Sequence, residues 1–175
     1  MNTNILMKRF AAILGSALMG MMLANVSYAT LEVATAEVEF ASPISIAPAN
    51  QLQFGVLDVA LNTQTIIIAT DDGVSGNGTG FILGGTRLAA DLTITATAGP
   101  LLSILVNNIL PGAGYTLTAF ICKYAAEADT ACDVGGYTAT AVASGTLKIG
   151  ATLTGDGSAT AGNRDGTFDV TVTYQ

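Results

Sequence analysis

The feature that most constrains this chain is the C-terminal stretch Gly162–Gln175, in which apolar and polar residues alternate strictly from Phe168 onward. One face of an extended strand here would carry the aromatic and β-branched residues Phe168, Val170, Val172 and Tyr174. The other face would carry Asp169, Thr171, Thr173 and Gln175. A two-residue period built from such residues is the strongest single-sequence indication of a half-buried β-strand. A strand with one apolar face needs a cover, so we expect the rest of the chain to supply one.

Further alternating or β-branched runs follow one another through the chain, separated by glycine- and proline-rich turns. We expect strands at Leu52–Val56, Thr63–Thr70, Phe81–Leu83, Leu92–Ala98, Leu101–Val106, Tyr115–Tyr124, Tyr137–Ala143 and Leu147–Leu153. The glycine-rich stretch Asp71–Gly80 should be a loop or a hairpin with long tips, Gly155–Gly166 a loop, and Pro48–Asn50 a turn. Only Ala125–Asp129 could form a helical turn. Eight or nine such strands predict an antiparallel, Ig-like β-sandwich.

The N-terminal segment has the pattern of a secretory signal peptide. Lys8 and Arg9 precede the apolar run Phe10–Ala24, and Ser27 and Ala29 place small residues before an expected cleavage site. A retained membrane anchor is the alternative. We therefore predict three parts, namely a signal peptide (residues 1–29), an N-terminal extension (30–47) and a β-sandwich domain (48–175). The rest of the chain offers no second apolar run of about 18 residues, so we expect no membrane insertion after processing.

The charge and the cysteine content limit which cellular compartments and which classes of partner fit this sequence. Removal of residues 1–29 leaves four basic and 13 acidic side chains, a net charge of −9, which disfavours binding to nucleic acid. The two cysteines, Cys122 and Cys132, predict a disulfide in an exported protein. Two reduced buried thiols are the alternative.

The sequence offers no set of residues for catalysis, and we expect no enzyme. It contains no histidine, which excludes Ser–His–Asp and Cys–His arrangements. We predict no metal and no cofactor. Calcium is the alternative, held by Asp71, Asp72 and Asn77 or by Asp156 and Asp165, although the EF-hand spacing is absent.

The C-terminal strand resembles the last strand of chaperone–usher pilus subunits. That family carries a glycine fourteen residues from the end, alternating hydrophobic residues and a penultimate tyrosine. Gly162, Phe168, Val170, Val172 and Tyr174 match this pattern. Leu52-Gln53-Phe54-Gly55, together with this ending, also resembles a family of secreted bacterial domains of unassigned function.

The pilin resemblance implies a mechanism and a set of partners. A pilin sandwich lacks one strand, which a periplasmic chaperone supplies first and the N-terminal extension of the next subunit then replaces. The outer-membrane usher would be the second partner, and identical subunits would form a surface filament after transit through the periplasm. The C-terminal strand would line the groove and contact the chaperone. Its residues in this role would be Gly162, Phe168, Val170, Val172 and Tyr174. The donor strand would be Ala34, Ala36, Val38, Phe40, Ser42, Ile44 and Ile46, which share one alternating track.

The same extension fits a second interpretation. Residues 30–47 could be the first strand of a complete sandwich, paired within their own chain. The protein would then be a self-complete secreted domain with a non-catalytic surface or ligand-binding role. Sequence alone does not distinguish pairing within one chain from pairing between chains.

Overall fold

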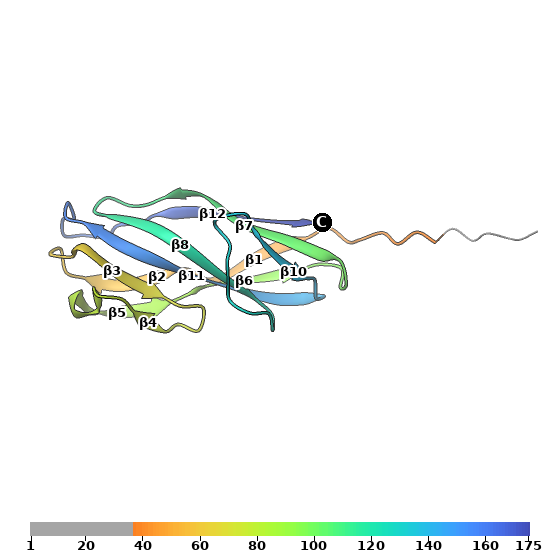
Figure 1. Cartoon of the computed structure of the whole chain (residues 1–175), viewed down its shortest axis with the longest axis horizontal. Helices are drawn as coiled ribbons and strands as arrows, with labels where there is room; N and C mark the ends of the chain where they lie inside the picture. Colours follow the sequence, from red (N-terminus) through yellow and green to blue (C-terminus); the bar gives the residue numbers. More distant parts are fainter. Residues whose placement is uncertain (1–36) are drawn as a thin grey trace, which may run out of the picture. The chain divides into compact units, whose positions relative to one another are not determined.

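The computed structural model describes residues 37–175, and Figure 1 shows the course of the chain. The chain divides into two units, residues 1–39 and residues 40–175, and the strands of the described residues lie in the second unit. Within the described residues, helical structure is limited to one 3₁₀ turn, Thr79–Phe81. No helix there is long and apolar enough to cross a membrane. The expected signal peptide and the donor residues Ala34 and Ala36 lie outside the described residues.

The second unit consists of twelve strands. They are β1 (Ser45–Asn50), β2 (Gln53–Leu57), β3 (Asn62–Ile68), β4 (Val74–Ser75), β5 (Ile82–Leu88), β6 (Ala90–Thr95), β7 (Leu101–Leu110), β8 (Tyr115–Tyr124), β9 (Thr130–Ala131), β10 (Tyr137–Thr140), β11 (Ser144–Asp156) and β12 (Thr167–Tyr174). All strand pairs are antiparallel. The predicted antiparallel β-sandwich is confirmed.

The larger sheet is built around β11, the longest strand (Figure 1). One edge of β11 pairs with β8, whereas the other edge pairs first with β6 and then with β3. Its inward residues Leu147, Ile149 and Leu153 are buried, as their alternation with polar residues predicts. Gly150 lies where β6 gives way to β3, and a Cβ atom there would meet the carbonyl oxygen of Ile68. A glycine is therefore required where β11 changes partners.

A three-stranded sheet in the order β10-β7-β12 forms the second layer, and β2 and β5 form a separate pair. The core between the layers includes Phe120 and Tyr124 of β8 and Leu102 and Ile104 of β7, all fully buried. Phe168 of β12 packs against Phe120 with ring centroids 5.0 Å apart. This contact joins the C-terminal strand to the centre of the core.

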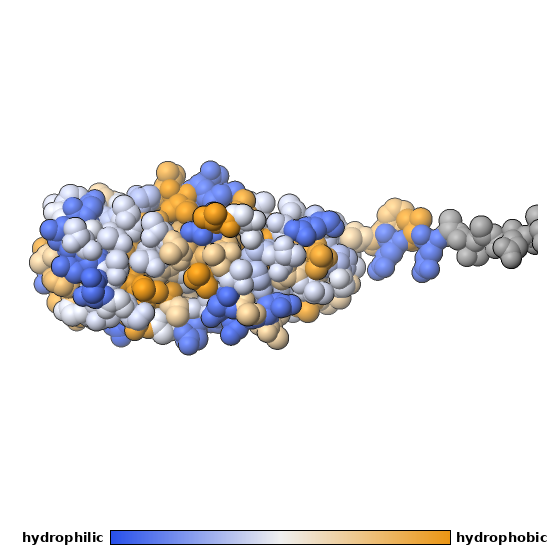
Figure 2. All heavy atoms as spheres, viewed as in Figure 1, coloured by the Kyte–Doolittle hydropathy of each residue, from blue (hydrophilic) through white to orange (hydrophobic). Residues whose placement is uncertain are grey.

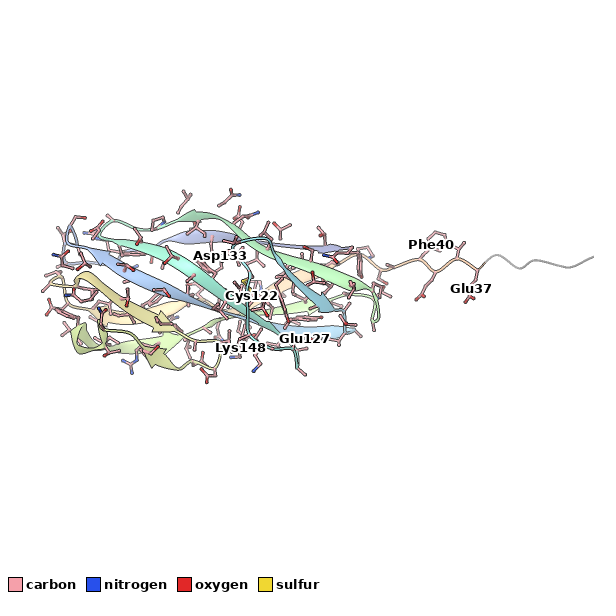
Figure 3. All side chains as sticks on the ribbon, viewed as in Figure 1. Glu37, Phe40, Cys122, Glu127, Asp133 and Lys148 are labelled. Atoms are coloured by element: carbon pink, nitrogen blue, oxygen red, sulfur yellow. A yellow bond between two sulfur atoms is a disulfide. The ribbon has the colours of Figure 1, made fainter. Side chains whose placement is uncertain are left out.

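The predicted disulfide between Cys122 and Cys132 is present, and Figure 3 shows it beside β8. Both cysteines are fully buried. The Cys132 amide donates to the Phe120 carbonyl oxygen at 3.1 Å, and the Phe120 amide donates to Asp133 Oδ2 at 3.1 Å. Closing so short a loop stabilises the fold by about 3 kcal/mol in the chain-entropy model.

One local expectation needs correction. Pro48–Asn50, expected to be a turn, forms the end of β1, where a register shift between Pro48 and Asn50 accommodates the proline at a sheet edge. β1 therefore crosses the boundary expected between residues 47 and 48. Of the two expectations for Asp71–Gly80, a loop or a hairpin with long tips, the structure shows the hairpin, because β4 pairs with β3 before the 3₁₀ turn begins.

One prediction concerns two core tyrosines that differ in hydrogen bonding. The buried Tyr137 hydroxyl has no hydrogen-bond partner among the described residues, whereas the Tyr124 hydroxyl accepts from the Val142 amide at 3.3 Å. Burial raises the pKa of Tyr137, and the backbone of Tyr124 opposes this shift without reaching hydrogen-bond geometry. We expect Tyr137→Phe to raise the free energy of unfolding by about 1 kcal/mol in urea titrations, because an unsatisfied polar group leaves the core.

The matched control is Tyr124→Phe, which should lower the free energy of unfolding. The raised pKa also sets a pH dependence. Tyr137 ionisation does not affect the free energy of unfolding below its ordinary pKa of about 10, and this free energy falls as the pH rises from there through the raised folded-state pKa, because the unfolded chain loses the proton more easily. Tyr137→Phe should remove this alkaline loss. Equal destabilisation by both substitutions would contradict the assignment.

Candidate functional site

β12 lies at the end of its sheet and pairs with β7 alone. Its inward residues Val170, Val172 and Tyr174 lie opposite Val106, Ile104 and Leu102, respectively. The three β7 residues are at most 1% exposed, whereas their β12 neighbours are only half-buried. The inward side chains of β12 are therefore less buried than those of the neighbouring β7, and the apolar side of β12 is incompletely covered.

Other sheet edges carry features that limit pairing with a second chain. β4 and β9 each span two residues, and β1 has a proline and a register shift. Short edge strands, prolines and bulges are the usual protection against strand addition. β12 spans eight residues without proline, and its only charged residue is Asp169. It is therefore a long and regular edge that is open to an added strand.

Gly162, which the resemblance grouped with this strand, lies in the preceding loop. It adopts a φ of +123°, a region that favours glycine, and no neighbour would obstruct a Cβ atom there. The need for glycine is therefore conformational, and the residue lies outside the pairing edge itself.

The structure divides the expected donor residues at Ser42. Val38 and Phe40 are 70% and 88% exposed, and Figure 3 shows the Phe40 ring on a segment without regular structure. Ile44 packs against the core of its own chain, and Ile46 lies in β1 opposite Ile94. The last two residues therefore contact their own chain, Ile44 through the core and Ile46 through an exposed edge strand.

Ser42 is held by a small hydrogen-bonded junction that includes the penultimate residue. The Tyr174 hydroxyl donates to the Ser42 carbonyl oxygen at 2.9 Å and accepts from the Thr97 amide at 2.7 Å. The Ser42 amide donates to Thr97 Oγ1 at 2.6 Å. Thr97 has no distinguishing signal in the sequence, because it is one of many threonines in or next to strands.

The acidic loop residues considered for calcium engage other partners. Asp72 accepts from the Ala89 amide at 2.8 Å and lies 3.7 Å from Lys148 Nζ, while Asp71 accepts from the Gly73 amide at 3.0 Å. The backbone amide and then the hydroxyl of Ser158 lower the pKa of Asp156. In residues 37–175, no group of three or more potential ligands is placed to hold a metal ion.

The outer surface is otherwise mixed in character. Figure 2 shows separated apolar groups among polar residues on the visible face. An open hollow of about 450 Å³ lies among Ile67, Ala119, Ile121 and Asp129. The Thr70 hydroxyl donates to Asp129 Oδ1 at 2.6 Å on its wall. This hollow is shallow and has one charged group.

The division at Ser42 generates a prediction about stability. Ile44→Asp should lower the free energy of unfolding by about 2 kcal/mol or more, because it places a charge against the core. Phe40→Asp should change it by less than about 0.5 kcal/mol, because the ring is exposed. Urea denaturation of the two variants checks both values. Similar losses in both variants would show that Phe40 also belongs to the folded core.

Comparison with known proteins gives one match. No curated protein and no solved structure matches the chain. A family model described as a domain of unknown function, DUF4402, matches residues 44–174, which is more than half of the chain. This segment runs from Ile44, one residue before β1, to Tyr174 at the end of β12. The chain therefore belongs to the DUF4402 family.

Proposed function

We propose that this protein is a structural subunit of a bacterial surface filament, assembled by strand donation between copies. The N-terminal segment of one copy would pair with the free edge of β12 in the next. The observation that carries the proposal is the half-buried inner face of this long edge strand, opposite fully buried β7 residues. The exposed Val38 and Phe40 of the same chain supply apolar groups of matching spacing.

The chemistry of such a contact is non-covalent. An added strand would satisfy the unpaired backbone groups of β12 and cover its apolar side chains. Burial of one large apolar side chain contributes about 1.5–3 kcal/mol, so two of them supply a substantial part of a stable contact. The proposal requires no catalytic group, metal or cofactor.

Export and assembly factors belong to the same proposal. The signal-like N-terminus would direct the chain to the periplasm, and the disulfide fits an oxidising compartment. A free apolar edge is an aggregation hazard. A periplasmic chaperone that covers β12, and an outer-membrane usher that exchanges the cover for the next subunit, would manage this hazard.

A self-complete secreted domain is the second candidate function. The observation in its favour is the pairing of β1 with β6 of the same chain, which fills one side of the sandwich without a partner. In that case β12 would remain an unpaired edge strand of the monomer. The hollow beside Asp129 would then be the candidate ligand-binding site. The experiment below separates the two.

The test uses Phe40→Asp, with Val134→Asp as a matched control. Both side chains are exposed, at 88% and 80%, so neither substitution should affect folding. We expect Phe40→Asp to abolish filament growth, seen by light scattering and electron microscopy, because a charged residue cannot enter an apolar edge. Val134→Asp should form filaments like the wild-type chain.

A mixing experiment adds a directional readout. The Phe40→Asp subunit keeps an intact β12 and should still receive a strand, so adding it to the wild-type chain should shorten filaments in proportion to its amount. Filaments of unchanged length and number in the mixture would contradict donation through Phe40. A wild-type chain that stays monomeric at high concentration, with and without chaperone, would favour the self-complete domain.

A further inference from the structure

We propose that Tyr174 is a positioning residue for the donated strand, because its hydroxyl fixes the point at which the N-terminal segment changes from its own sandwich to a second copy. This inference rests on the proposed function and concerns the same contact. The partner is a second copy of this chain. Tyr174 would thus serve both the accepting strand and the donated segment of one subunit.

The junction connects three parts of the chain that are distant in sequence. Tyr174 is the last residue of β12, Thr97 follows β6 by two residues, and Ser42 precedes β1 by three. Because β12 and β6 belong to different sheets, the tyrosine hydroxyl bridges the two layers of the sandwich. Figure 1 shows the C-terminus where the N-terminal segment enters the fold.

The hydrogen bonds coincide with the change in burial along the N-terminal segment. After Ser42, Ile44 contacts the core; before it, Phe40 is exposed. Ser42 is the one polar residue on the alternating track, and large apolar residues lie on both sides of it in the sequence, so the pattern alone does not show which side is buried. The junction places the change, because both the amide and the carbonyl of Ser42 are bound there.

The length that remains for donation matches the accepting strand. If Ser42 is fixed, the alternating track available to a second copy is Ala34–Ala41, which has eight residues. β12 also has eight residues. At about 3.3 Å per residue, both span about 26 Å when extended. The donated strand is therefore Ala34–Ala41, with Ile44 and Ile46 excluded from it.

Holding Ser42 in place should accelerate donation of the segment before it. The ordering of a segment on binding has an entropic cost, which falls when one end is already held in place. Without the Tyr174 hydroxyl, residues 42 and 43 would move with the donated segment, and more chain would have to be ordered at each addition. The aromatic ring of residue 174 would still pack at the end of β12, so β12 should still accept a strand from another copy.

The test compares the full-length wild-type chain with Tyr174→Phe. Tyr115→Phe is the matched control, because it also removes a half-buried tyrosine hydroxyl bonded to a backbone carbonyl, that of Arg164. Hydrogen exchange of refolded monomers should show the Ser42 and Thr97 amides exchanging about 10-fold faster in Tyr174→Phe. The Ile104 amide should be unchanged, and Tyr115→Phe should leave all three as in the wild-type chain.

Two further measurements separate donation from acceptance. Affinity for a synthetic Ala34–Ala41 peptide should change less than about twofold in Tyr174→Phe, whereas filament elongation should slow about 10-fold. Thr97→Val, which removes the acceptor for the Ser42 amide but keeps the side-chain shape, should also slow elongation. Concordant slowing in both variants, with normal peptide binding, supports the positioning role.

The failures are distinguishable. Wild-type elongation in Tyr174→Phe, beside normal filaments of the wild-type chain, overturns the positioning role alone. Equal loss of peptide binding and elongation also overturns it, because the hydroxyl would then act in the accepting edge. A wild-type chain that neither binds the peptide nor forms filaments overturns strand donation itself, and the positioning role with it.

Discussion

Backbone hydrogen bonding along β11 is the interaction on which the rest of the sandwich depends. This strand brings β8, β6 and β3 into one sheet, and its inward residues occupy the centre of the core. Buried amide and carbonyl groups must be paired, and only a strand with neighbours along both edges meets this requirement in a sheet centre. Gly150 makes the arrangement possible, because a side chain there would collide with Ile68 where the partner changes.

The same requirement has a different outcome at β12. Its groups are paired along β7, while the opposite edge faces no strand in the described residues. The sequence of β12 nevertheless has the regular apolar alternation of an interior strand. A long, regular edge without the usual protection is costly in a free monomer, and this cost is reasonable where another chain is to pair with the edge. The fold and the proposed assembly are thus two consequences of one hydrogen-bonding rule.

The sequence was informative where local pattern and tertiary environment agree. Tyr115–Tyr124 was predicted as a strand with the limits that the structure shows, and the cysteine pair was predicted from composition and export. It failed at Pro48, because the tolerance of an edge bulge for proline depends on the neighbouring strand. It also could not divide the N-terminal track, since Phe40 and Ile44 have equivalent positions in the pattern and differ only in what lies beside them. Thr97 gave no signal, because its role depends on a backbone amide and a distant tyrosine.

The buried disulfide has a consequence for the order of events during biogenesis. Cys122 and Cys132 have no exposed surface in the finished fold, and the rate of thiol–disulfide exchange depends on access to the sulfur atoms. An oxidase must therefore act while β8 and the loop after it are still uncovered, before the two layers close. Once they have closed, a reductant meets the same barrier. The bond, once formed, should therefore persist through later changes in the redox conditions around the folded protein.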